Sequence, residues 1–579
     1  MDDAGDPLSA FREEAARALR AALAKVGAAE ADLLLERPPE GMGDIALPCF
    51  SISKLLRKAP DAIAKEIVSV MTSGEEMERA EAVGGYVNIH ARFDRLAERA
   101  FTAALSDGME YGSGAPRGER VLLEHTSVNP TGPVHIGRAR NPIIGDTIAR
   151  IMRLAGYNVT TEFYVNDVGR QVATMTWGVK NLRVAEEPER DKDDHRFVSY
   201  YREANRKCEE DPEAQAQVNE LLFKLEHGDP ETVSLNRQTS ERVLNGMLAS
   251  LADINVHIDG FMWESKLVED GSVDRVIDRL KGSRFCHESD GARHLELESF
   301  GITGRDTKWV FTRADGTSLY TTRDLAYHLD KFSRSDVAIN VLGEDQKLGM
   351  QQLAAALSII GSERAPETVF YSFVSLPEGR MSTRKGTVVT LDDLVDEAKE
   401  RAYEEVRKRR KDLPEERMRE IARIVGTGAL RYNIARIQAE KQIVFRWEEA
   451  LNFEGSSAPF VQYAHARACS IMRKASAAVS PDRAAACVGK LTTDHERALL
   501  KLIAAYPATV RECAEARRVH TVASFAQDLA SQFNQFYRYV PVLKAEGDTR
   551  DARIALVEAA RRTLRSALGC LGLEAPEEM

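Results

Sequence analysis

The sequence lacks any apolar run long enough to cross a membrane. No apolar stretch in its 579 residues approaches the roughly 18–20 residues that span a bilayer. The N-terminus, MDDAGDPLSAFREEAARAL, is acidic and amphipathic, unlike a secretory signal or a transit peptide. Low-complexity tracts and internal repeats are also missing. We therefore expect a folded cytoplasmic protein that makes no use of a membrane.

Cysteine is scarce, and its spacing argues against two common stabilising devices. The seven cysteines form no CxxC pair, so we expect neither a structural zinc site nor a disulfide framework, and no other metal site is predicted. Each thiol is expected to act as a small core hydrophobe in a reducing compartment. The cysteines are residues 49, 208, 286, 469, 487, 513 and 570.

The composition that remains is that of a large globular protein. Hydrophobic residues make up 43% and charged residues 29%, and 579 residues are too many for one core, so three or four domains are expected. The 90 acidic residues outnumber the 79 basic ones, for a net charge of −11. This balance neither requires nor excludes a nucleic-acid partner, because binding depends on where the positive charge lies.

The order of apolar patterns divides the chain into four parts. Residues 1–107 predict a small α+β domain. From residue 108 to 395, short apolar runs alternate with helical stretches, which predicts an α/β, doubly wound parallel (Rossmann-type) sheet, interrupted by a charged helical insertion at 178–256. A helical connector, 396–455, and an all-α domain, 456–579, complete the chain. The expected strands are Val121–His125, Asn158–Asp167, Val337–Asp345 and Glu367–Leu376.

A dense turn follows the first of these strands. The segment HTSVNPTGPVHIGRARNPIIGD places Pro130, Gly132, Pro133 and Gly137 between the strand and an amphipathic helix at Asn141–Gly156. A strand, a glycine-bearing turn and a helix start can hold an anion, because unpaired amides and the helix dipole face that point. Taken alone, the segment is equally compatible with an ordinary strand-to-helix connection.

A second loop of suitable chemistry follows the last expected strand. LPEGRMSTRKGTVVTLDDL carries Arg380, Ser382, Thr383, Arg384 and Lys385 within six residues. Basic and hydroxyl groups at this density suit a polyphosphate. Both loops lie at the carboxyl ends of strands of one parallel sheet, which is where ligands bind in such folds.

The two loops together resemble the HIGH and KMSKS signatures of class I aminoacyl-tRNA synthetases. Further stretches resemble arginyl-tRNA synthetases over nearly the whole chain: SLYTTRDLAYHLDKF, GTGALRYNIARIQAEKQIVFRWEEALNFEG and FVQYAHARACSIMRK. Two departures stand out. Arg138 replaces the last His of HIGH, and Arg380 and Thr383 replace the two Lys of KMSKS. Because arginine binds phosphate bidentately, we expect activity to be retained with the roles of these side chains redistributed.

The resemblance implies ATP-dependent attachment of L-arginine to tRNA(Arg) through an arginyl-adenylate, with Mg²⁺ accompanying ATP. No enzyme nucleophile is needed, so positioning and charge stabilisation dominate. The implied catalytic residues are His135, Arg138, Arg380, Arg384 and Lys385. The implied ATP contacts are Pro133, His135, Gly137, Met381 and Ser382.

The resemblance also implies an arginine site. Ser127 and Asn129 are expected at the carboxylate and amino group with Glu124 nearby, and Tyr320 and Asp324 at the guanidinium. Tyr320 and Asp324 stand four residues apart and so share one helix face. The alternatives are a packed aromatic for Tyr320 and a helix cap for Asp324. Glu264 and Gln346 are further matches, whereas His125 is interpreted as structural.

For tRNA, the resemblance implies contacts from residues 1–107 and from an anticodon-binding domain at 456–579, in a protein acting as a monomer. Tyr463, Phe536, Tyr537 and Tyr539 are the candidates for base stacking, although aromatic residues at helical spacing are more often core. Three other readings stay open: a class I synthetase for another amino acid, a nucleotidyltransferase that uses no tRNA, and a tRNA-binding relative without catalysis.

Overall fold

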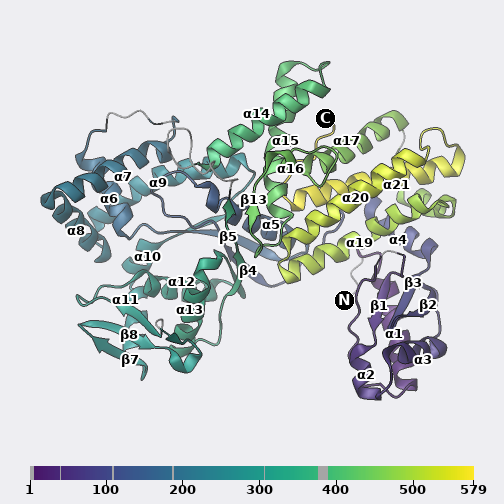
Figure 1. Ribbon diagram of the computed structural model, residues 1–579, viewed down its shortest axis with the longest axis horizontal. Coiled ribbons are helices and arrows are strands. Elements are labelled where there is room, and N and C mark those ends of the chain that lie inside the picture. The colour runs from purple at the N-terminus through teal and green to yellow at the C-terminus, as the bar shows by residue number, and fades with distance from the viewer. Residues whose placement is uncertain are drawn as a thin grey trace.

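The computed structural model describes residues 5–39, 41–106, 110–184, 188, 190–304, 307–375, 389–476 and 478–579. A small N-terminal domain projects from the helical C-terminal part, and an α/β region lies at the other end of the molecule (Figure 1). No helix in the described part of the chain is both long and apolar enough to cross a membrane. All seven cysteines are free thiols, and five of them are buried.

The central sheet is parallel throughout, as predicted. Its order is β11-β10-β4-β5-β6. The strand of this sheet that comes first in the sequence, β4, therefore lies in the middle, and the order reverses between β4 and β10. All four predicted strands are found within a few residues of their expected bounds. The strands are β4 (Arg120–Glu124), β5 (Asn158–Val165), β6 (Gly260–Trp263), β10 (Val337–Gly343) and β11 (Glu367–Tyr371).

Helices occupy the connections between the strands. A helical group between β5 and β6 corresponds to the predicted insertion but begins earlier, at Arg170. The group consists of α6 (Arg170–Asn181), α7 (Asp193–Glu210), α8 (Pro212–Glu226) and α9 (Pro230–Asp253). The remaining connecting helices are α5 (Arg140–Leu154), α10 (Glu264–Glu269), α11 (Ser272–Lys281), α12 (Tyr320–Arg334) and α13 (Lys347–Ile359).

A three-stranded antiparallel sheet that the sequence did not predict lies between α11 and α12 (Figure 1). Its strands β7 and β8 carry charged residues instead of an apolar run, and this composition hid them. Its strands are β7 (Cys286–Ser289), β8 (Ala292–Glu296) and β9 (Lys308–Thr312).

The N-terminal domain is α+β, as predicted. Its antiparallel sheet has the order β1-β3-β2. The last helix, α4 (Phe93–Leu105), leaves this domain and packs on the C-terminal helices. Ion pairs Asp44–Lys501 (2.8 Å) and Asp6–Arg511 (2.9 Å) fasten the domain there. Its other elements are α1 (Ser9–Lys25), β1 (Ile45–Pro48), α2 (Phe50–Leu56), α3 (Pro60–Val70), β2 (Met77–Val83) and β3 (Tyr86–Ala91).

From residue 391 on, the described chain is almost entirely helical. A two-residue strand, β13 (Ile443–Val444), pairs with β12 (Val374–Ser375) and ties this part to the α/β region. One large apolar cluster runs through both parts, which makes them a continuous body. The helices are α14 (Leu391–Arg409), α15 (Glu415–Ala435), α16 (Trp447–Ala450), α17 (Ala458–Ala475), α18 (Pro481–Ala486), α19 (Asp494–Ala516), α20 (Val519–Tyr539) and α21 (Gly547–Cys570).

Candidate active site

The turn after β4 leaves the sheet at the point where the strand order reverses. Thr126 and Ser127 both have positive φ, 73° and 22°, a conformation that costs non-glycine residues about 1–3 kcal/mol each and is found mainly at functional sites. Asn141 holds the turn by accepting the Thr126 amide at 2.7 Å. Ser127 Oγ donates to Glu124 Oε1 at 2.8 Å and accepts the Tyr164 amide at 3.0 Å. The expected residues Glu124 and Ser127 are therefore in direct contact.

The HIGR segment forms a short 3-10 turn, η1 (Ile136–Arg138), that leads into α5. His135 Nδ1 accepts the Gly137 amide at 3.0 Å. Burial lowers the pKa of His135, and the positive charge of Arg138 lowers it further, so the ring is neutral at pH 7. A Cβ at position 137 would lie 3.0 Å from His135 Nδ1, so any larger residue there would push the His135 ring aside. Arg138 is exposed at this helix start, where anions bind.

The two signature motifs are joined by main-chain hydrogen bonds. The Ile136 amide donates to the Val389 carbonyl at 3.2 Å, and the Leu391 amide donates to the Val134 carbonyl at 2.7 Å. Thr390 then caps α14 in a capping box with Asp393. Residues 389–391, which follow the second motif in the sequence, thus lie directly beside the first motif. The expected site residues of the second motif lie outside the described part of the chain: Arg380, Met381, Ser382, Arg384 and Lys385.

Arg140 is a residue whose importance the sequence did not reveal. Its guanidinium is completely buried and donates to four carbonyls, those of Ser372 (2.7 Å), Lys441 (2.6 Å), Gln438 (2.6 Å) and Ile437 (3.4 Å). These hydrogen bonds fix the start of α5 against the segment that follows α15. Because burial disfavours the charged form, the pKa of Arg140 falls to about 10, which still leaves it charged at pH 7.

The first turns of α12 present the candidate guanidinium ligands. Tyr320 is 66% exposed, which argues against the packed-aromatic alternative. Asp324 is also no helix cap, because α12 begins at Tyr320 after Leu319 and has no side-chain cap. Its carboxylate is 42% exposed and lies 3.2 Å from His328 Nδ1. Burial by itself raises the pKa of Asp324, but the interactions with His328 and Lys331 together hold the pKa below its usual range.

Glu264 lies behind the site, and its expected contact with the amino acid remains a prediction. Its side chain is 1% exposed, and Oε1 accepts a hydrogen bond from Arg323 Nε. Among the described residues, Oε2 has no hydrogen-bond partner. Burial raises the pKa of Glu264 to about 7, against the opposing effect of Arg323. Glu264 therefore holds Arg323 in place and offers no open face to a ligand.

The remaining amino-acid candidates occupy the rim. Asn129 is exposed and donates to Gln171 Oε1 at 2.8 Å, and Gln346 is exposed beyond β10 with its amide 3.1 Å from Asp345. His125 is buried, as its structural interpretation requires, and burial lowers its pKa to about 4.

One group of possible metal ligands occurs among the described residues: Asp194, His195 and Asp392. The Lys192 ammonium lies 2.8 Å from Asp392 and 3.5 Å from Asp194, and so already supplies a cation. His195 Nε2 lies 2.8 Å from the same Asp392 carboxylate. The group reads as a buried ion-pair cluster that fastens α7 to the start of α14.

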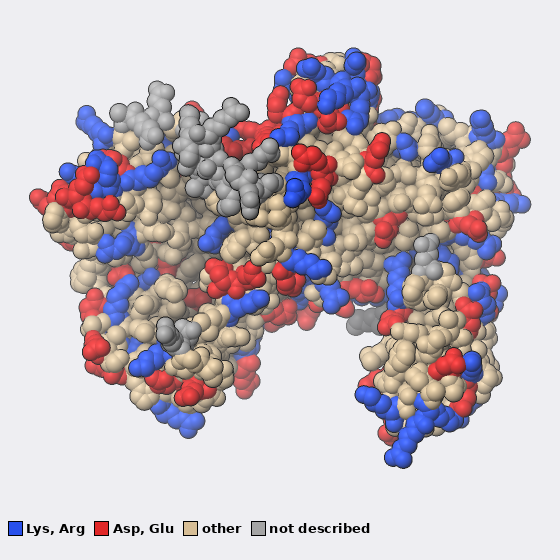
Figure 2. Space-filling view, in the orientation of Figure 1, with Lys and Arg blue, Asp and Glu red and all other residues tan. Residues whose placement is uncertain are grey.

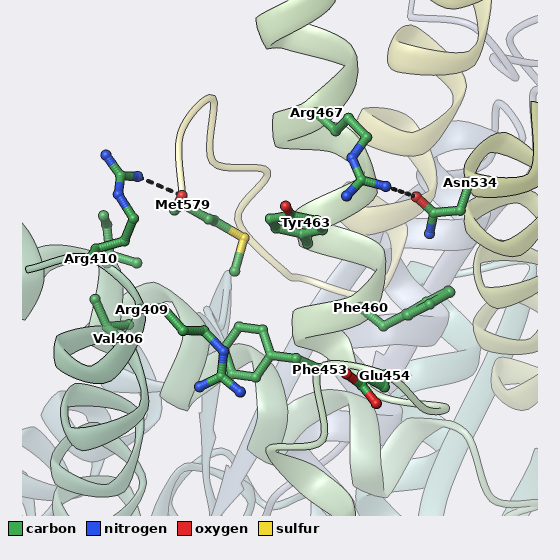
Figure 3. Close-up of a pocket in the computed structure, with 11 residues that line it drawn as sticks. Val406, Arg409, Arg410, Phe453, Glu454, Phe460, Tyr463, Arg467, Asn534 and Met579 are labelled. Carbon is green, nitrogen blue, oxygen red and sulfur yellow. Dashed lines mark hydrogen bonds between the residues drawn. The ribbon is translucent and has the colours of Figure 1, made fainter. Parts of the chain in front are cut away.

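Aromatic and basic side chains line a cavity of about 570 Å³ in the C-terminal region (Figure 3). Tyr463 and Tyr537 are 41% and 46% exposed, and the Arg467 guanidinium lies over both rings, 4.6 Å and 4.8 Å from their centroids. Arg467 also donates to Asn534 at 2.7 Å. The cavity thus combines ring faces with a cation, as sites for splayed bases do.

The two other aromatic candidates differ from each other. Phe536 is fully buried, so the expectation that it stacks on a base is wrong for this conformation: it packs beside Phe533 in the core, with ring centroids 6.3 Å apart. Tyr539 is 60% exposed and stacks on His495 at 5.0 Å.

Comparisons with known proteins decide the family. The model described as "tRNA synthetases class I (R), catalytic domain" matches residues 100–447, and those for the "Arginyl tRNA synthetase N terminal domain" and the "DALR anticodon binding domain" match 13–91 and 461–579. The chain belongs to the arginyl-tRNA synthetase family. The resemblance of the motifs is thereby confirmed.

Individual relatives match this chain over nearly its whole length. The arginine–tRNA ligase of Methanocella arvoryzae is 48% identical over 572 residues, 98% of this chain and 99% of the relative. That of Methanothermobacter thermautotrophicus is 46% identical over 573 residues, with the same coverage. The solved arginyl-tRNA synthetase of Thermus thermophilus superposes with a TM-score of 0.83 at 31% identity, covering 98% of this chain and 100% of that one.

Proposed function

We propose that the protein is an arginine–tRNA ligase that activates arginine with ATP and transfers it to tRNA(Arg). The observation that carries the proposal is the HIGR turn at the strand-order reversal of a parallel sheet, in a chain of this family. Ligands bind in the crevice at such a reversal. The arginine carboxylate attacks the α-phosphate and pyrophosphate leaves. A ribose hydroxyl of the terminal tRNA adenosine then attacks the acyl carbon of the adenylate, and AMP leaves.

On the nucleotide side, His135, Gly137 and Arg138 meet ATP. Gly137 lets the nucleotide approach the backbone, and neutral His135 is free to donate from Nε2, because its Nδ1 already accepts the Gly137 amide. The Arg138 cation stands at the helix start, where charge develops on the phosphates. We assign Arg380, Arg384 and Lys385 to the leaving pyrophosphate. Mg²⁺ enters as part of the ATP substrate, on its phosphate oxygens.

On the amino-acid side, exposure and charge favour Asp324 as the ligand of the guanidinium. Glu264 is buried against Arg323, whereas the Asp324 carboxylate is half-exposed and forms no ion pair with a Lys or Arg of the described residues. Exposed Tyr320 stands one turn before it on the same helix. Ser127 and Asn129, at the β4 turn, are proposed to meet the carboxylate and amino group.

For tRNA, the cavity lined by Tyr463 and Arg467 is proposed to take splayed anticodon bases, together with the exposed Tyr537 ring on the other side of the Arg467 contact. A second contact is proposed at the N-terminal domain, where exposed Lys54 lies in α2 and exposed Arg57 and Lys58 follow it. Figure 2 shows basic side chains gathered at the tip of this domain, although acidic and basic groups are mixed over the rest of the visible face. We propose that a single chain carries out both steps.

ATP–pyrophosphate exchange with each amino acid, with and without tRNA, tests the proposal. We expect exchange with arginine alone among the amino acids, followed by charging of tRNA. Exchange with lysine or glutamine in place of arginine would assign the chain another specificity. Tight tRNA binding without any exchange would make it a non-catalytic relative, and exchange without later tRNA charging would point to a different acyl acceptor.

A further inference from the structure

Lys331, on α12, is a completely buried cation that the proposed reaction has not used. Its side chain is 0% exposed, and its ammonium donates to Glu124 Oε2 and, at 2.7 Å, to Asn340 Oδ1. It also lies 4.1 Å from the centre of the Tyr327 ring. A lysine is almost never fully buried unless it is paired, so this side chain has a specific task at the site.

The first consequence concerns Glu124. One carboxylate oxygen is held by Lys331 and the other by Ser127 Oγ. Ser127 belongs to the strained turn after β4, so Lys331 fixes the orientation of that turn through Glu124. The pairing also cancels the charge of Glu124, since an ammonium and a carboxylate in contact have no net charge.

The second consequence reaches Asp324 by way of two other side chains. An ammonium only donates, so the Asn340 atom facing Lys331 must be the oxygen, and its NH₂ group therefore faces His328 Nε2 at 2.8 Å. Because that NH₂ group only donates, His328 Nε2 must accept. The ring is then neutral with its proton on Nδ1, which donates to the Asp324 carbonyl at 2.8 Å and faces its carboxylate at 3.2 Å.

We propose that Lys331 is a positioning residue for both acidic side chains of the arginine site, Glu124 and Asp324. Lys331 neutralises and orients Glu124. Through Asn340 it also fixes the His328 tautomer, which holds Asp324 in position. Of the two carboxylates, Glu124 and Asp324, only Asp324 then keeps a charge that is not cancelled. This inference rests on the proposed function. Asp324, His328 and Lys331 stand at i, i+4 and i+7 on α12 and therefore share a face.

The tautomer supplies a test that does not depend on activity. In protein carrying ¹⁵N-histidine, with the His328 signal assigned through a His328→Gln variant, we expect the Nδ1-protonated neutral ring. In Lys331→Met the Asn340 amide is free to turn over, so His328 should show the Nε2-protonated form. An Nε2-protonated ring in the wild type, or an unchanged signal in Lys331→Met, would overturn the inference.

Kinetics supply the second test. Lys331→Met should raise the arginine KM at least tenfold while the ATP KM stays within twofold. Arg334→Met is the matched control: it removes a cation one turn later on α12, where Arg334 pairs with Glu162 at 2.8 Å, and we expect an unchanged arginine KM. An unchanged arginine KM in Lys331→Met, or an equal rise in the control, would refute a positioning role.

Lys331→Met leaves the buried Glu124 carboxylate without its cationic partner. We therefore compare this variant with a second one in which the charges stay balanced. In Lys331→Met/Glu124→Gln both charges are removed, which buried ion pairs commonly tolerate. We expect Lys331→Met to raise the arginine KM by a smaller factor in the Glu124→Gln background than in the wild type, because the route through Glu124 is already lost while the route through Asn340 and His328 remains. An equal factor in both backgrounds would contradict the Glu124 route. If wild-type protein fails to activate arginine, the proposed function fails, whereas the tautomer result still decides the inference.

Discussion

Replacing Asp324 with asparagine removes one charge at the proposed guanidinium position and almost no volume. The carboxylate is 42% exposed, so the cost of breaking a fully buried ion pair does not apply. A hydrogen bond to a charged group is worth about 1.5–3 kcal/mol, and this range corresponds to a rise in the arginine KM of roughly tenfold to 150-fold. The asparagine oxygen can still accept from His328, so we expect the melting temperature to move by no more than about 2 °C.

The assay is ATP–pyrophosphate exchange with arginine titrated at saturating ATP and tRNA. Calorimetric binding of arginine accompanies it, because KM equals Kd only when chemistry is slow. The ATP KM should stay within twofold of the wild type. Tyr320→Phe is the companion variant and should raise the arginine KM about 2- to 10-fold through loss of one hydroxyl. If Asp324→Asn binds arginine with wild-type affinity, α12 is scaffold and the guanidinium is held elsewhere.

Three further results are expected. Binding to tRNA should weaken steadily as salt rises despite the net charge of −11, since basic clusters release counterions from phosphates; a flat response would show that these clusters are only solvated surface. Arg467→Met should weaken tRNA binding about tenfold, because it removes the cation between Tyr463 and Tyr537; filter binding measures this. The arginine KM should not change. Equal weakening in an Arg423→Met control would count against a specific site. Because the folded pKa of Glu264 is about 7 and the unfolded value about 4.3, wild-type stability relative to Glu264→Gln should fall as pH rises from about 4.5 to about 7, by at most about 4 kcal/mol; parallel urea-unfolding profiles for the two proteins would disprove the shift.

Much of the sheet could be predicted from local pattern, and the exceptions have physical reasons. The runs that became β4, β5 and β10 are apolar or β-branched and end in turn residues, which is the signature of a buried parallel strand. The edge strand β6, GFMW, has four residues, too short for any periodicity to be recognised. The strands β7 (CHES) and β8 (ARHLE) are short and mostly polar, so their pairing is decided by tertiary contacts.

Some residues of the site could likewise be predicted from the sequence, and others could not. The turn at His135 and Gly137 was predictable, because its chemistry lies in consecutive residues. Phe536 and Tyr537 are neighbours on α20, and no local signal told which of them faces the core. Lys331 carried a faint signal, since polar residues at 324, 328 and 331 share one face of a helix with buried Leu325 and Tyr327. Its partners, however, come from strands that only the folded sheet brings near.

The placement of α4 bears on how the protein is made. Its apolar face, which includes Phe93 and Phe101, is covered by α19 and α21. Roughly 390 residues separate the end of α4 from the start of α19, and a ribosome adding about 5–20 residues per second needs about 20–80 s to produce them. For that time the nascent chain carries a hydrophobic helix whose partner does not yet exist. We expect this helix to be the main chaperone-binding segment during synthesis.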